Sequence, residues 1–103
     1  MDERSIPEAV LRDKNAVEML RVWIAGNRIH CSIKVGMYLE STRIPEERAW
    51  GVILADVARH ISIALDSGFS LNRYESLNKI EESFLQELTD PTSPVEGEFS
   101  RET

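Results

Sequence analysis

The stretch RAWGVILADVARHISIALDSG, residues Arg48–Gly68, is the longest helical pattern in this chain of 103 residues. Its apolar residues cover about half of a helical wheel, which is more than a helix in water carries. Some other surface has to cover this face. The apolar residues are Ala49, Trp50, Ile53, Leu54, Val57, Ala58, Ile61, Ala64 and Leu65.

Both ends of this helix are marked in the sequence. Pro45 suits the first turn, where its missing N–H is not needed, and Glu46 and Glu47 lie at the positive end of the helix dipole. Gly68 can end the helix in a left-handed conformation.

Upstream of the helix, residues 19–37 contain two β-rich runs separated by Gly26-Asn27, a pair that favours a tight hairpin. With this pair in the loop, one register sorts aliphatic from polar residues on both strands. Slipping by one residue would exchange the faces, so the register is well determined. The aliphatic pairs are Ile24 with Ile29, Val22 with Cys31 and Leu20 with Ile33; the outer pairs are Trp23 with His30, Arg21 with Ser32 and Met19 with Lys34.

The remaining segments complete an α+β pattern. Ser5 and Glu8 have capping-box spacing and predict a short helix at about Pro7–Arg12. Residues 38–44 have no clean period, so we expect an irregular connection into the long helix there. After Gly68 we expect Phe69 and Leu71 to enter the core. Asn72 can then cap a second helix with a narrow apolar stripe, made of Tyr74, Leu77, Ile80, Phe84 and Leu88.

Residues 1–89 are predicted to form a single α+β domain, followed by a flexible acidic tail at 90–103 that is rich in Pro, Ser and Thr. The predicted fold is a short N-terminal helix, an antiparallel hairpin and two C-terminal helices packed on one sheet face as a two-layer sandwich. A lone hairpin is marginally stable and too narrow for the long helix. We therefore expect a homodimer.

Charge and cysteine content exclude several classes of protein. The net charge of −6 is shared equally between residues 1–89 and the tail, so no basic patch for nucleic acid or anionic membrane is expected. The single cysteine, Cys31, allows no internal disulfide and favours a reducing compartment. With no signal peptide and no apolar run of about 20 residues, we expect a cytoplasmic protein.

The first candidate site is Asp56, Arg59 and His60 on the long helix, where Asp56 and His60 are one turn apart and the carboxylate can orient the imidazole. The structural alternative is a polar rim in which Asp56 pairs with a neighbour. Cys31 is an unfavourable nucleophile, because the hairpin register puts it on the aliphatic face.

The second candidate site is the outer hairpin face with Trp23, His30 and Arg21, flanked by Ser32 and Lys34. A tryptophan beside cations can bind an aromatic or anionic ligand, or the face can be covered by another subunit. No metal-binding spacing, phosphate loop or dinucleotide fingerprint is present, so neither a metal nor a cofactor is predicted.

The stretches LRVWIAGNRIHCSI (Leu20–Ile33) and AWGVILADVARHISIAL (Ala49–Leu65) resemble a family of small bacterial proteins, mainly from alphaproteobacteria, known only as a domain of unknown function. The resemblance implies a small cytoplasmic α+β protein and no activity. Two functions stay open: a non-enzymatic homodimeric module that binds a protein or a small ligand, and a small enzyme or regulatory domain using Asp56, Arg59 and His60. The missing catalytic motif favours the first.

Overall fold

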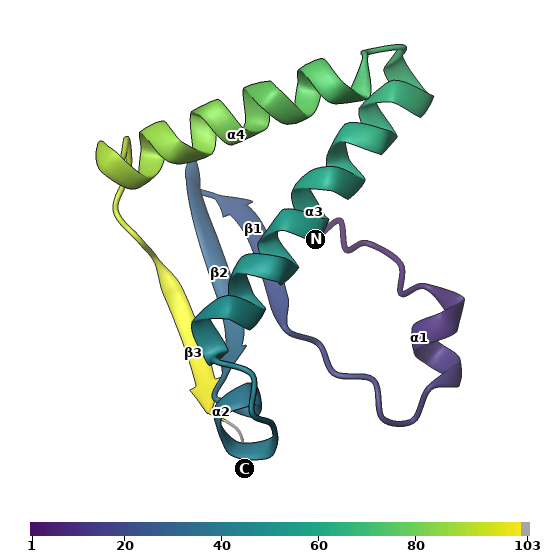
Figure 1. Ribbon diagram of the computed structural model, residues 1–103, viewed down its shortest axis with the longest axis vertical. Helices are drawn as coiled ribbons and strands as arrows, with labels where there is room; N and C mark the ends of the chain where they lie inside the picture. Colours follow the sequence, from purple (N-terminus) through teal and green to yellow (C-terminus); the bar gives the residue numbers. More distant parts are fainter. Residues whose placement is uncertain (102–103) are drawn as a thin grey trace.

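The computed structural model describes residues 1–101, and within them the chain is an α+β protein with a three-stranded mixed sheet and four helices (Figure 1). None of these helices combines the length and the apolar character needed to cross a bilayer. The elements in chain order are α1 (Glu8–Arg12), β1 (Leu20–Ala25), β2 (Arg28–Val35), α2 (Met37–Ser41), α3 (Glu46–Phe69), α4 (Arg73–Thr89) and β3 (Gly97–Arg101).

The hairpin of β1 and β2 has the predicted register. Trp23 lies opposite His30 on one face, and Val22 lies opposite Cys31 on the other. Gly26 and Asn27 form the turn with φ angles of 58° and 62°, the left-handed values that a tight primed turn requires. The local turn chemistry and the alternation of side chains therefore fix this part of the fold.

The third strand corrects the prediction of a hairpin alone. β3 lies inside the segment predicted to be a flexible tail, yet it pairs in parallel with β2, with Gly97 in register with Cys31. Only Phe99 among its five residues is strongly apolar, so the sequence shows no strand pattern. The strand depends on contacts with β2 that no local pattern reveals. The predicted boundary at residue 89 stays a prediction.

Helix α2 also corrects the sequence analysis, which expected an irregular connection there. Gly36 precedes the helix with a φ of 98°, a left-handed value that suits glycine. The helix has only five residues and no apolar period of its own. It forms because a carboxylate from α3 binds its first N–H groups, as described below.

Helices α3 and α4 match their predicted positions within a few residues. The predicted cap of α4 is confirmed, because the Asn72 side chain accepts hydrogen bonds from the N–H groups of Tyr74 and Glu75. Two other end signals are wrong. Gly68 is helical and Ser70 takes the left-handed conformation, with a φ of 58°. Helix α1 begins after Pro7 with no side-chain cap, so the predicted capping box does not form.

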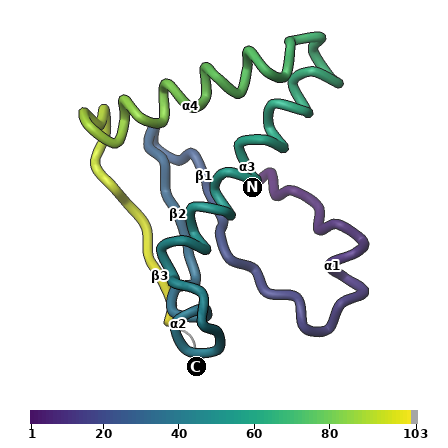
Figure 2. The backbone as a smooth tube through the Cα atoms, viewed as in Figure 1, coloured from purple at the N-terminus to yellow at the C-terminus, as the bar shows by residue number. Residues whose placement is uncertain are grey.

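Helices α3 and α4 meet at residues 70–72 and diverge from there as a V, while α1 lies apart from the other elements (Figures 1 and 2). In the view of Figure 1, α3 crosses the sheet and α4 runs back toward its upper end. The closest packing between elements lies within the sheet, between α3 and α4, and between α2 and α3. The two-layer sandwich stays a prediction.

The single chain buries very little of its apolar surface. Within residues 1–101 only Ala49, Glu46 and Ser62 are buried. Phe69 is 75% exposed and Leu71 is half exposed, so neither enters a core as predicted. The accessible surface is 8973 Å², against about 5,900 Å² for a compact monomer of 11.7 kDa. The radius of gyration is 15.5 Å, against about 13 Å for a compact chain of this length.

Candidate functional site

The outer face of the hairpin brings Arg21 and Trp23 together. The Arg21 guanidinium carbon lies 5.0 Å from the centre of the Trp23 ring, a cation–π distance. The same guanidinium forms ion pairs with Glu3 and, at 3.2 Å, with Glu18. The hydrogen bond to Glu3 is the main cause that raises the pKa of Arg21. Arg21 is thus already bound by carboxylates of its own chain.

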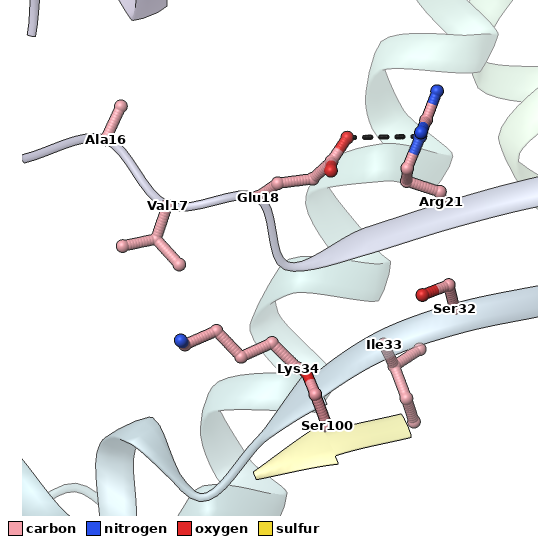
Figure 3. A pocket seen from close by; sticks show the side chains of 8 residues that line it. All are labelled: Ala16, Val17, Glu18, Arg21, Ser32, Ile33, Lys34 and Ser100. Carbon is pink, nitrogen blue, oxygen red and sulfur yellow. Dashed lines mark ion pairs between the residues drawn. The ribbon is translucent and has the colours of Figure 1, made fainter. Parts of the chain in front are cut away.

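A polar hollow of about 410 Å³ lies beside this face (Figure 3). Its walls combine the segment before β1 with side chains of all three strands; they are Ala16, Val17, Glu18, Arg21, Ser32, Ile33, Lys34 and Ser100. The Glu18 carboxylate points toward Arg21, as the dashed line in Figure 3 shows. Three residues of the predicted outer face, Arg21, Ser32 and Lys34, therefore meet at one hollow, and Trp23 and His30 do not line it.

His30 lies at the junction with the third strand. Its Nε2 atom is 3.6 Å from Oε2 of Glu96, and Arg28 forms an ion pair with the other oxygen of the same carboxylate. Glu96 is the residue immediately before β3. The structure thus gives His30 a contact with the C-terminal segment that the sequence analysis did not foresee.

The helix cluster of Asp56, Arg59 and His60 is not brought together with Trp23. Arg59 Nη1 lies 3.3 Å from Asp56 Oδ1, and both side chains are about two-thirds exposed. His60 is exposed, and its side chain forms no hydrogen bond or ion pair with any residue between 1 and 101. Arg59 lines the groove described next, whereas Asp56 and His60 line neither hollow.

An apolar groove of about 440 Å³ runs between α3 and α4 on the open side of the V. Three small residues of α3, together with Leu54 and Arg59, form one wall, and larger residues of α4 form the other. The sequence indicated an apolar face on each helix, but it gave no sign that the helices diverge. The lining residues are Gly51, Leu54, Ala55, Ala58, Arg59, Leu77, Asn78, Ile80, Glu81, Phe84 and Leu85.

Glu46 organises the connection between the sheet and α3, and the sequence analysis missed this role. Only 8% of the residue is exposed. Its carboxylate accepts hydrogen bonds from the backbone N–H groups of Gly36, Tyr38 and Leu39 at 3.0, 2.9 and 3.2 Å. The Trp50 indole N–H also donates to it, at 2.9 Å.

These bonds lower the pKa of Glu46, with the backbone hydrogen bond from Gly36 as the main cause. The carboxylate therefore acts as a charged cap for α2 that is supplied from another helix. The four-residue spacing of Glu46 and Trp50 was the one sequence signal that could have indicated their pairing.

Metal-ligating side chains are scattered in the part of the chain that the structure describes. No group of three or more His, Cys, Asp or Glu residues is arranged there to hold a metal ion. Cys31 is a free, half-buried thiol.

Comparison with solved structures finds chains of similar fold. One of them is a chain from the photosynthetic bacterium Rhodopseudomonas palustrus CGA009 that carries the provisional name of a pyruvate dehydrogenase. The two chains superpose with a TM-score of 0.63 and 25% sequence identity, over 91% of this chain and 90% of that chain. A comparison with curated proteins found no match.

The family comparison covers most of the chain. A family described as a domain of unknown function (DUF5076) matches residues 3–92. This range includes the hairpin and both long helices, the stretches on which the resemblance rested, and stops before β3. The alphaproteobacterial origin that the resemblance implied stays a prediction. The chain belongs to the DUF5076 family of domains of unknown function.

Proposed function

We propose that the chain is a non-enzymatic binding module that works as a homodimer in the cytoplasm, and that its two copies associate through the groove between α3 and α4. The observation that carries this proposal is the large apolar surface that the single chain leaves uncovered, which includes the apolar groove of about 440 Å³ between these helices.

The shape and chemistry of the groove suit a helix of a second copy. Gly51, Ala55 and Ala58 give α3 a low wall that another helix can approach closely. Across the groove, Phe84 and Leu85 of α4 are 47% and 55% exposed. Apolar side chains at half exposure gain free energy when a partner removes them from water. The apolar faces of α3 and α4 in a second copy supply such a partner.

The amount of uncovered surface is large enough for the interface of a permanent dimer. The excess over a compact monomer is about 3,000 Å² for each chain, or about 6,000 Å² for a pair, whereas obligate homodimers bury roughly 2,000–5,000 Å² in total. An extended N-terminal segment accounts for part of this excess, and the remainder is still ample. Association would also allow α3 and α4 to complete the predicted helical layer on one face of the sheet.

The binding surface of this module is the outer hairpin face, where Trp23, Arg21 and His30 lie beside the polar hollow. The exposed Asp56–Arg59 pair supports the enzymatic alternative less well, because Asp56 and His60 line neither of the two described hollows. We do not extend the dehydrogenase name of the solved relative to this chain, since at 25% identity a shared fold does not carry an activity.

Size-exclusion chromatography with light scattering tests the dimer. We expect about twice 11.7 kDa across the accessible concentration range, and an unfolding temperature that rises with protein concentration. A folded species of 11.7 kDa whose unfolding temperature is independent of concentration would contradict the proposal.

A further inference from the structure

The third strand is held in place by few contacts. All five residues of β3 are exposed, and within residues 1–101 β3 packs closely against β2 alone. Apart from the backbone hydrogen bonds to β2, the described side-chain contacts that hold this segment are those of the Glu96 carboxylate with Arg28 and His30. An edge strand with no buried side chain opens at low free energy compared with the rest of a fold. β3 is therefore the element of the sheet that can leave most easily.

The backbone of β2 nevertheless restricts which residue can lie opposite Cys31 at this edge. The Cys31 N–H donates to the Glu96 carbonyl oxygen at 3.2 Å, which starts the parallel ladder. A side chain at position 97 would overlap the Cys31 carbonyl oxygen and would come within 2.7 Å of the Cys31 nitrogen, so glycine is required. The φ of Gly97, 126°, adds to this requirement.

Two further features extend this selectivity along the strand. The carboxylate immediately before the glycine forms an ion pair with Arg28, which supplies complementary positive charge, and lies 3.6 Å from Nε2 of His30. Two residues after the glycine, Phe99 lies in register with Ile33, on the aliphatic face of the sheet. The segment that pairs with this edge thus has an acidic residue, a glycine, any residue and then an apolar residue, although Phe99 itself is 66% exposed.

We propose that the outer edge of β2 is a docking site for an extended peptide segment of another polypeptide with this acidic–Gly–x–apolar pattern, and that residues 96–101 of the chain occupy it as a removable strand. The partner adds a strand parallel to β2, a known mode of peptide recognition. Main-chain hydrogen bonds supply affinity, while Arg28, His30 and the space at Gly97 supply specificity. This site goes beyond the dimer function and does not use the α3–α4 groove.

The test uses the full-length chain and an end-capped peptide of residues 94–101, PVEGEFSR. Gly97→Ala in the protein should release its own strand, which hydrogen exchange at the Cys31 amide reports directly. The fluorescently labelled peptide should then bind the Gly97→Ala protein at least tenfold more tightly than the wild type, in which the strand competes. Glu96→Lys in the protein provides a second way to weaken the strand, through repulsion from Arg28.

Peptide variants supply matched controls. A peptide with alanine in place of the glycine should lose binding, a peptide with glutamine in place of the first glutamate should bind several-fold more weakly, and a scrambled peptide should not bind. Equal binding to wild type and variants, or no binding to either variant, would overturn the proposal. Unchanged protection of the Cys31 amide in both variants would also overturn it.

Light scattering on the same samples separates this outcome from the dimer proposal. If the protein binds the peptide and is monomeric, the docking proposal stands and the dimer proposal fails. If two copies exchange their C-terminal segments, the mass measured by light scattering changes. In that case the partner of the β2 edge is a second copy of this chain, and the proposal of another polypeptide is overturned.

Discussion

Arg73 binds one carboxylate oxygen of Asp66 through two of its own nitrogens, with Nε at 3.0 Å and the backbone nitrogen at 3.3 Å from Oδ2. The contact closes the turn between the end of α3 and the start of α4. It lowers the pKa of Asp66, with the side-chain hydrogen bond from Arg73 as the main cause. This pair therefore fixes the apex of the V, from which the apolar groove opens.

Arg73→Met should loosen this apex, because it keeps an apolar stem and removes the side-chain donor. We expect the unfolding temperature to fall by several degrees and the pKa of Asp66 to move up toward its ordinary value. Thermal unfolding and NMR titration of the Asp66 carboxyl group measure the two effects. An unchanged Asp66 titration would show that the backbone N–H alone holds the carboxylate.

Acid should destabilise the protein partly through Glu46. The folded-state pKa of this carboxylate is lowered, so its contribution to stability is fully present at neutral pH. The contribution starts to fall as the pH approaches the ordinary value, about 4.3, and it is lost below the folded-state pKa. Glu46→Gln should therefore lower stability at pH 7 and flatten its dependence on pH below 5. The free energy of unfolding is measured by denaturant unfolding at a series of pH values. If it falls equally steeply below pH 5 in the variant and the wild type, Glu46 does not have this role.

Asn72→Ala should remove the cap of α4. The Asn72 Oδ1 atom accepts from the N–H groups of Tyr74 and Glu75, both at 3.0 Å, and loss of such a cap costs about 1 kcal/mol. Asn72→Asp keeps an acceptor at the same place and should cost much less. Urea unfolding of the two variants side by side measures the difference, and equal losses of stability would show that the loss in Asn72→Ala does not come from the missing acceptor.

Leu85→Asp should prevent association through the groove, because it places a charge among the apolar residues of α4. Gln86→Asp is the matched control, since it changes the neighbouring, exposed position on the same helix and adds the same charge. We expect the first variant to be monomeric or unfolded and the second to remain dimeric by light scattering. Folded dimers of both variants would place the interface elsewhere.

The elements that could be predicted are those whose signals are local. Gly26-Asn27 and the alternation around it determine the hairpin, and Asn72 determines the start of α4. β3 and α2 could not be predicted, because each depends on a contact across the chain. Gly97 needs the backbone of Cys31, and α2 needs the carboxylate of Glu46.

In the candidate site, too, the sequence predicted the local features but not the contacts between distant segments. The register correctly placed Arg21 beside Ser32 on the outer face, which explains why both line the polar hollow. It could not show that Glu3 and Glu18 fold back onto Arg21, or that Glu96 reaches His30. Those contacts join segments without periodic patterns, and side-chain pairing of this kind leaves no trace in spacing.

The cap that Glu46 places on α2 has a consequence for the order in which the protein melts. A five-residue helix cannot persist alone in water, so α2 exists only while the first turn of α3 holds its carboxylate in position. Fraying of that turn dissolves α2 at the same moment and frees the Trp50 indole. In a Trp23→Phe variant, which keeps Trp50 as its one tryptophan, emission should therefore change before the helical circular dichroism signal does, so that Trp50 reports local unfolding early.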